Sequence, residues 1–157
     1  MASEDLLERI LRAPVYDVAV ETPLDEAKLL SAQLGNRVLI KREDLQPVFS
    51  FKIRGAYNRI SGLDAVERKA GVVAASAGNH AQGVAMAATK LGVHSRIVMP
   101  RTTPGIKVDA VRRFGGEALL EGDTYDEAAT LANRIREEEG RVFIHAYDDL
   151  DVIAGQG

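Results

Sequence analysis

Short apolar runs alternate with longer amphipathic segments along most of the chain. The short runs, rich in Val, Ile, Leu and Ala, predict strands at 38–41, 72–75, 96–99, 118–120 and 142–145. The longer segments carry apolar residues at helical spacing and predict helices at 50–61, 79–91, 104–114 and 125–139. The later strands each follow a glycine suited to a left-handed helix end, namely Gly71, Gly92, Gly116 and Gly140. This alternation predicts an α/β fold in which helices flank a parallel sheet on both faces.

Composition places the chain among ordinary globular proteins. It has 157 residues, 46% of them hydrophobic, which is enough to bury the core of one domain. The net charge is −3 with basic residues spread along the chain, so we expect no nucleic-acid partner and no membrane partner. The chain has no cysteine, and His94 and His145 lack metal-ligand spacing to each other or to His80. We therefore predict no metal site.

The two ends of the sequence suggest a location and a larger context. Four charged residues interrupt the first nine positions, unlike a signal peptide, and no window approaches the roughly 18 apolar residues of a membrane span. We expect a cytoplasmic protein. The final "DDLDVIAGQG" resembles the entry to a further helix, and we expect the chain to be part of a longer polypeptide.

The stretch "PVFSFKIRGAYNRI" holds a lysine in an unusual setting. Lys52 lies between Phe51 and Ile53, and Ser50 just before it is a good helix N-cap. A helix N-terminus and partial desolvation both disfavour the charged ammonium form. A neutral amine is the form that attacks a carbonyl, so Lys52 is a candidate Schiff-base lysine, although most lysines simply lie on the surface.

A second candidate site is the glycine-containing junction at 76–80, "SAGNH". It joins a predicted strand to a predicted helix, at the carboxyl edge of a parallel sheet where ligands bind. The free N–H groups of the helix and the absence of a side chain at Gly78 suit a bound anion. The simpler alternative is that Ser76 and Asn79 only cap the helix, and that His80 is a hydrogen-bonded structural histidine.

Two nucleotide-binding motifs are absent. No G-x-G-x-x-G follows the predicted strand, which weakens a nucleotide-binding Rossmann domain. Gly78 and Gly83 have P-loop separation, but Val84 and Ala85 stand where Lys and Ser or Thr are needed.

The two candidate segments together resemble a known family. "SFKIRGA" and "SAGNHAQG" resemble the cofactor-lysine motif and the substrate-carboxylate loop of fold-type-II pyridoxal 5'-phosphate enzymes. Longer segments, such as "KREDLQPVFSFKIRGAYNRI", "PRTTPGIKVDAVRRFGGEA" and "VIAGQG", resemble the biosynthetic threonine dehydratases, or threonine ammonia-lyases, within that family. The resemblance implies a tryptophan synthase beta-like fold, incomplete at its C-terminus. Residues 1–50 would open a large domain, 51–147 would form a small α/β subdomain, and 148–157 would re-enter the large domain.

The resemblance also implies roles for individual residues. Lys52 would be catalytic and would hold the cofactor as a Schiff base. Phe51 would pack against the pyridine ring, and Asn79 would hydrogen-bond the cofactor's 3'-oxygen. The substrate carboxylate would be bound by one loop, through Ser76, Gly78, Asn79 and His80.

The reaction implied is the conversion of L-threonine to 2-oxobutanoate and ammonia, the first step of isoleucine biosynthesis, and of L-serine to pyruvate, by a homotetramer. Serine racemases carry a second serine where this chain has Ala77, which cannot transfer a proton, so racemisation is disfavoured. Two alternatives stay open: a catabolic threonine or serine dehydratase, and a non-catalytic α/β module that binds a small anion.

The resemblance leaves part of the site unaccounted for. The family's glycine-rich phosphate loop and its partner for the pyridine nitrogen have no counterpart in this sequence. Gly115 and Gly116 are most simply a helix C-cap. We therefore expect the 157 residues alone to bind the cofactor weakly and to be inactive.

Overall fold

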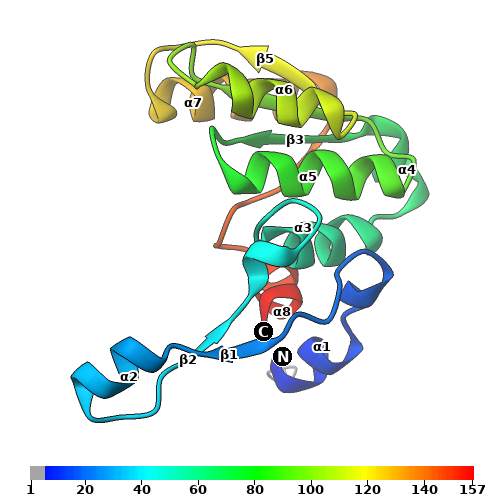
Figure 1. The fold of residues 1–157 in the computed structure, drawn as a ribbon. Helices are drawn as coiled ribbons and strands as arrows, with labels where there is room; N and C mark the ends of the chain where they lie inside the picture. The colour runs from blue at the N-terminus through cyan, green and yellow to red at the C-terminus, as the bar shows by residue number, and fades with distance from the viewer. Residues whose placement is uncertain (1–5) are drawn as a thin grey trace.

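A four-stranded parallel sheet forms the centre of the computed structural model, which describes residues 6–157 (Figure 1). Its strands lie in the order β5-β4-β3-β6. Their bounds are β3 (Val72–Ala75), β4 (Ser95–Met99), β5 (Glu117–Leu120) and β6 (Val142–Phe143). All four residues of β3 are buried, as expected of a central strand covered on both faces. The predicted α/β fold with a parallel sheet is confirmed.

Alternate side chains of the strands pack on opposite faces of the sheet. Val72 and Ala74 join the core on the side of α5 (Asn79–Lys90) and α6 (Gly105–Arg113). Val73 and Ala75 join the core under α7 (Tyr125–Glu139). Helix α7 buries its apolar face through residues at helical spacing and is capped by Thr124 and Glu127, which form a capping box.

A further layer lies beyond α5. Helix α3 (Lys52–Ser61) packs against both α5 and α8 (Leu150–Gln156), as Figure 1 shows. It forms because its apolar residues recur at helical spacing and are buried on one side: Ile53, Ala56, Tyr57 and Ile60. The layers therefore run from α7 through the sheet to α5, α3 and α8.

Residues 24–41 lie outside these layers (Figure 1). Strands β1 (Leu24–Glu26) and β2 (Leu39–Lys41) form an antiparallel pair, and α2 (Lys28–Leu34) connects them in an arm that extends away from the sheet (Figure 1). The remaining helices are α1 (Leu6–Arg12) and α4 (Ala65–Ala70), with 3-10 turns at Val15–Asp17 and Glu43–Leu45. Within residues 6–157, no helix is long and apolar enough to cross a membrane.

The structure corrects several predicted bounds. The strand predicted at 38–41 belongs to the antiparallel arm and not to the parallel sheet. The strand predicted at 142–145 ends at Phe143, because the chain then turns around the side chain of His145. At the end of α6, Gly115 and not Gly116 has a positive φ, 85°. Gly140 ends α7 in the left-handed conformation, as predicted.

Candidate active site

The order of the strands creates a switch point beside β3. The chain passes from β3 to β4 and β5 on one side, whereas β6 returns to the other side of β3. Crevices at the carboxyl ends of strands that flank such a point are where open α/β sheets bind ligands. The loop at 76–78 leaves β3 there, and the segment at 144–148 leaves β6 there. The candidate site is built around these two segments and Lys52.

Lys52 is the first residue of α3, and its amine reaches the segment after β6. Its Nζ donates a hydrogen bond to the carbonyl oxygen of Ala146 at 2.6 Å. The Phe51 ring lies beside the amine, with its centroid 5.1 Å from Nζ. Partial burial lowers the pKa of Lys52, because desolvation disfavours the ammonium form. The direction of this shift is the one that the sequence analysis expected from partial desolvation of the amine.

Ser50 supports the start of α3 without being its N-cap. The N-cap position is held by Phe51, and the Ser50 hydroxyl accepts the backbone N–H of Lys52 at 3.2 Å. This bond satisfies one of the N–H groups that a helix leaves free at its start. Ser50 therefore fixes the backbone of the lysine itself.

The loop after β3 presents the first turn of α5 to the same region. Gly78 is the N-cap, and the Ser76 hydroxyl accepts hydrogen bonds from the N–H groups of Gly78, at 3.2 Å, and Ala81, at 3.3 Å. Ser76 thus caps the helix. A side chain at Gly78 would meet only open space, so a ligand can approach the backbone there. The N–H groups of Asn79 and His80 lie in the first helical turn, where no intrahelical acceptor exists, and can receive an anion.

Gly83 brings this loop and Lys52 together. A Cβ at position 83 would lie 3.0 Å from both the carbonyl carbon and the carbonyl oxygen of Lys52. The backbones of α5 and α3 therefore approach each other closely where Gly83 faces Lys52. The glycine that closes the "SAGNHAQG" motif allows this approach.

The His80 side chain points into the core and not toward the open side of the loop. It is 4% exposed, and its Nε2 donates to the carbonyl oxygen of Ile144 at 2.9 Å, since a carbonyl can only accept. Burial lowers the pKa of His80 to about 4, so the ring is neutral near pH 7. If His80 contacts a substrate carboxylate, it does so through its backbone N–H.

The sequence analysis did not predict two groups that lie near the site, the Ala146 carbonyl and the Lys107 amine. Ala146 contributes only a backbone carbonyl, 94 residues from Lys52, and no local pattern signals such a contact. Lys107, in α6, places its Nζ 3.5 Å from the Asn79 side-chain oxygen and adds positive charge beside the loop. Its position in "TPGIK", after a predicted strand, is a weak signal that could have suggested it.

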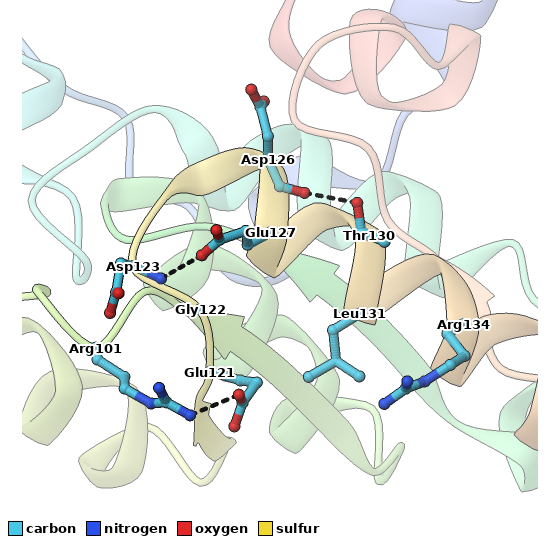
Figure 2. Close-up of a pocket in the computed structure, with 9 residues that line it drawn as sticks. All are labelled: Arg101, Glu121, Gly122, Asp123, Asp126, Glu127, Thr130, Leu131 and Arg134. Carbon is cyan, nitrogen blue, oxygen red and sulfur yellow. Dashed lines mark hydrogen bonds and ion pairs between the residues drawn. The ribbon is translucent and has the colours of Figure 1, made fainter.

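A pocket of about 560 Å³ lies away from Lys52, between the end of β5 and α7 (Figure 2). Several of its polar groups pair with one another: Arg101 with Glu121 at 2.6 Å, and Glu127 with the Asp123 N–H at 2.6 Å. It contains none of the predicted site residues. A smaller pocket of about 230 Å³ is lined partly by Phe51 and Arg54. In the part of the chain that the structure describes, no group of three or more His, Cys, Asp or Glu could hold a metal ion.

The chain is similar to known enzymes over nearly its whole length. The "L-threonine dehydratase biosynthetic IlvA" of Burkholderia multivorans is 55% identical over 160 residues, which cover 100% of this chain and 32% of that relative. The solved structure of the processed form of threonine deaminase isoform 2 from Solanum lycopersicum has a TM-score of 0.91 at 52% identity, and the match covers 99% of this chain and 44% of that one. Maize serine racemase has a TM-score of 0.87 at 34% identity, with 96% and 45% covered.

This chain thus spans about a third of the length of the curated relative. The family described as pyridoxal-phosphate dependent enzyme matches residues 15–157, which include every element that builds the site. The chain therefore belongs to the family of pyridoxal-phosphate dependent enzymes, with a fold-type-II sheet.

Proposed function

We propose that the protein containing this chain is a biosynthetic L-threonine ammonia-lyase that also accepts L-serine. The observation that carries the proposal is the half-buried amine of Lys52, at the switch point of the sheet and on a backbone that packs against α5 at Gly83. The relatives named L-threonine dehydratase and threonine deaminase, at 55% and 52% identity, support this substrate over others.

The residues present fit the aldehyde and the ring of pyridoxal phosphate. The desolvated Lys52 amine suits a carbonyl carbon, and the Phe51 ring, 43% exposed, offers an apolar face beside it. Asn79 would hydrogen-bond the ring oxygen. When bound, the cofactor supplies an electron sink for the charge that develops on the substrate Cα. No glycine run longer than two stands in the sequence to hold the phosphate.

Each residue has a separate task in the proposed reaction. The backbone N–H groups of Asn79 and His80, beside the open space at Gly78, hold the substrate carboxylate and thereby orient the Cα–H bond. The neutral Nζ of Lys52 removes the Cα proton, and it can do so only while unprotonated. The positive charge of Lys107 favours the carboxylate through space.

Serine racemisation is the second candidate, favoured by the similarity to maize serine racemase. Racemisation needs a second proton-transfer group on the opposite face of the cofactor. The residue after Ser76 is Ala77, whose methyl group cannot transfer a proton. We expect L-serine to yield pyruvate and no D-serine, which chiral chromatography of the reaction mixture measures.

We also propose the domain division implied by the resemblance: 1–50 and 148–157 in a large domain, 51–147 in a small one. It is supported by the arm of β1, α2 and β2 lying apart from the sheet (Figure 1). The homotetramer, the cytoplasmic location and the role in isoleucine biosynthesis stay predictions.

Substitution of the lysine tests the proposed function directly. Lys52→Ala should abolish the visible absorbance of lysine-bound cofactor. Because the variant also lacks the group that removes the Cα proton, turnover of L-threonine should fall by about 10²–10⁴-fold from this effect alone. Borohydride reduction followed by peptide mapping should label Lys52 in the unmodified protein. Lys90→Ala, an exposed lysine at the end of α5, is the matched control and should keep both properties. Full activity in Lys52→Ala would disprove the assignment.

A further inference from the structure

The buried imidazole of His80 has no part in the proposed chemistry. It nevertheless contacts the segment after β6, whose Ala146 carbonyl accepts a hydrogen bond from Lys52. Its Nε2 donates to the Ile144 carbonyl at 2.9 Å. Among the described residues its Nδ1 is buried and has no hydrogen-bond partner. An apolar side chain would remove this unpaired nitrogen, but it would also leave the Ile144 carbonyl without the His80 donor. Packing alone therefore does not account for a histidine here, and the N–H donor is what the ring supplies.

The segment that His80 contacts, residues 144–148, is folded as one unit, which we call the β6 turn. The His145 Nδ1 accepts hydrogen bonds from the N–H groups of Tyr147, at 3.3 Å, and Asp148, at 2.8 Å. The rings of His145 and Tyr147 pack edge to face with centroids 4.6 Å apart. Because the turn is closed on its own side chain, the carbonyls of Ile144 and Ala146 are held in a fixed relation.

The β6 turn thus connects His80 to Lys52. At one end it accepts the His80 N–H, and two residues later its Ala146 carbonyl accepts the Lys52 ammonium at 2.6 Å. The same first turn of α5 that carries His80 also carries the N–H groups proposed to bind the substrate carboxylate. His80 is therefore the link between the carboxylate loop and the acceptor of the lysine.

We propose that His80 is a positioning residue, whose buried Nε2–H holds the β6 turn against α5 so that the Ala146 carbonyl stays on the Lys52 amine. The importance of this role for catalysis rests on the proposed function of Lys52, but the contact itself does not. A carbonyl acceptor stabilises the charged amine, whereas burial destabilises it. Holding the acceptor in place therefore sets how readily Lys52 becomes neutral.

The test measures the reactivity of Lys52 in protein stripped of cofactor. Competitive labelling with an amine-reactive reagent, such as acetic anhydride, followed by peptide mapping gives the labelling rate of Lys52 relative to exposed Lys90. His80→Phe keeps a buried ring but removes the donor, so the turn is released and Lys52 should label about threefold faster or more relative to Lys90. His80→Gln keeps a side-chain N–H donor and should return the ratio toward that of the unmodified protein.

His94→Phe is the matched control. It also removes an imidazole, but His94 lies before β4, where it bonds Arg141, and should leave the ratio unchanged. The proposal is overturned if folded His80→Phe leaves the Lys52-to-Lys90 labelling ratio unchanged. It is also overturned if His80→Gln changes this ratio as much as His80→Phe does. If the phenylalanine variant does not fold, His80→Leu replaces it. In the unmodified protein, ¹⁵N NMR should find the proton of His80 on Nε2, and a proton on Nδ1 also overturns the proposal.

The outcome for His80 is separable from the proposed function. Reductive linkage of pyridoxal phosphate to a lysine other than Lys52 would defeat the function. The labelling ratio is measured without cofactor and would still decide whether His80 positions the turn.

Discussion

Glu43 and Arg54 form the best-protected ion pair near the site. The Arg54 Nε lies 2.7 Å and its Nη2 3.0 Å from the two Glu43 oxygens, and the Thr22 hydroxyl donates to the same carboxylate at 2.6 Å. The hydrogen bond from Arg54 lowers the pKa of Glu43 to about 2, although burial opposes the shift. Because Arg54 is two residues from Lys52, this pair anchors the first turn of α3 to the chain before it.

The pair makes folding stability depend on acid pH. The folded-state pKa of Glu43 lies below its ordinary value of 4.5, so the stabilisation is complete above that value and is lost as pH falls toward about 2. Glu43→Gln should lower the free energy of unfolding by about 1–2 kcal/mol at pH 7 and by much less near pH 2.5, allowing for partial screening by solvent. Urea unfolding at the two pH values measures this.

The matched control is Glu138→Gln, in the exposed i,i+4 pair with Arg134 on α7. It should change stability by less than about 0.5 kcal/mol at either pH. Equal effects of the two substitutions would show that Glu43 is only a surface charge.

At the scale of elements, the crossing of α3 and α8 depends on two glycines. A Cβ at Gly155 would lie 2.7 Å from the Arg54 carbonyl oxygen and 2.8 Å from the Gly55 Cα. A Cβ at Gly55 would in turn lie 2.6 Å from the Val152 carbonyl oxygen. The two backbones therefore touch, and a larger residue at either position must separate the helices.

Gly155→Ala should accordingly destabilise the protein by about 1–3 kcal/mol, the usual cost of overpacking. Thermal unfolding followed by circular dichroism measures the change. Gly105→Ala provides the control, because it lies at the start of α6 with nothing within reach of an added Cβ. That variant should be as stable as the unmodified protein or slightly more so. Similar loss of stability in both variants would mean that the α3–α8 approach is not close in solution.

At the scale of the whole molecule, the chain contains one part of the proposed active site. The lysine, the carboxylate loop and the β6 turn come together within residues 50–148. The sequence has no run of more than two glycines that could bind the cofactor phosphate. The chain is about a third of the length of the curated relative. The arm of β1, α2 and β2 also leaves apolar side chains exposed, such as Leu29 and Leu34.

We therefore expect the 157 residues alone to bind pyridoxal phosphate weakly and to release no ammonia from L-threonine. The phosphate of the cofactor would lack its ligands, so most of its binding free energy would be missing. A coupled ammonia assay and an absorbance titration with pyridoxal phosphate measure the two effects. Robust ammonia release by the 157 residues would contradict the expectation.

Several features of the fold and site were predictable from local sequence. Strand β3 is a continuous apolar run followed by a capping serine. Helix α7 is indicated by the helical spacing of its apolar residues and by the Thr124–Glu127 capping box. Lys52 and the loop at 76–80 could each be singled out by their neighbours. The Asp64–Glu67 capping box offered the same kind of signal for α4, which the sequence analysis missed. Strands β1 and β2 could not be assigned to an antiparallel arm, because all their residues are exposed and no buried face marks their register.

By itself, the sequence determined the longer helices α3, α5, α6 and α7, the strands of the parallel sheet and the two segments with chemical character, because burial imposes patterns that local residues record. Only the tertiary structure decided that β6 lies beside β3, that His80 turns into the core and that Ala146 meets Lys52. These contacts join residues 64 and 94 positions apart through backbone carbonyls, which every residue carries. Their partners are selected by the packing of whole elements and not by any side chain nearby in the sequence.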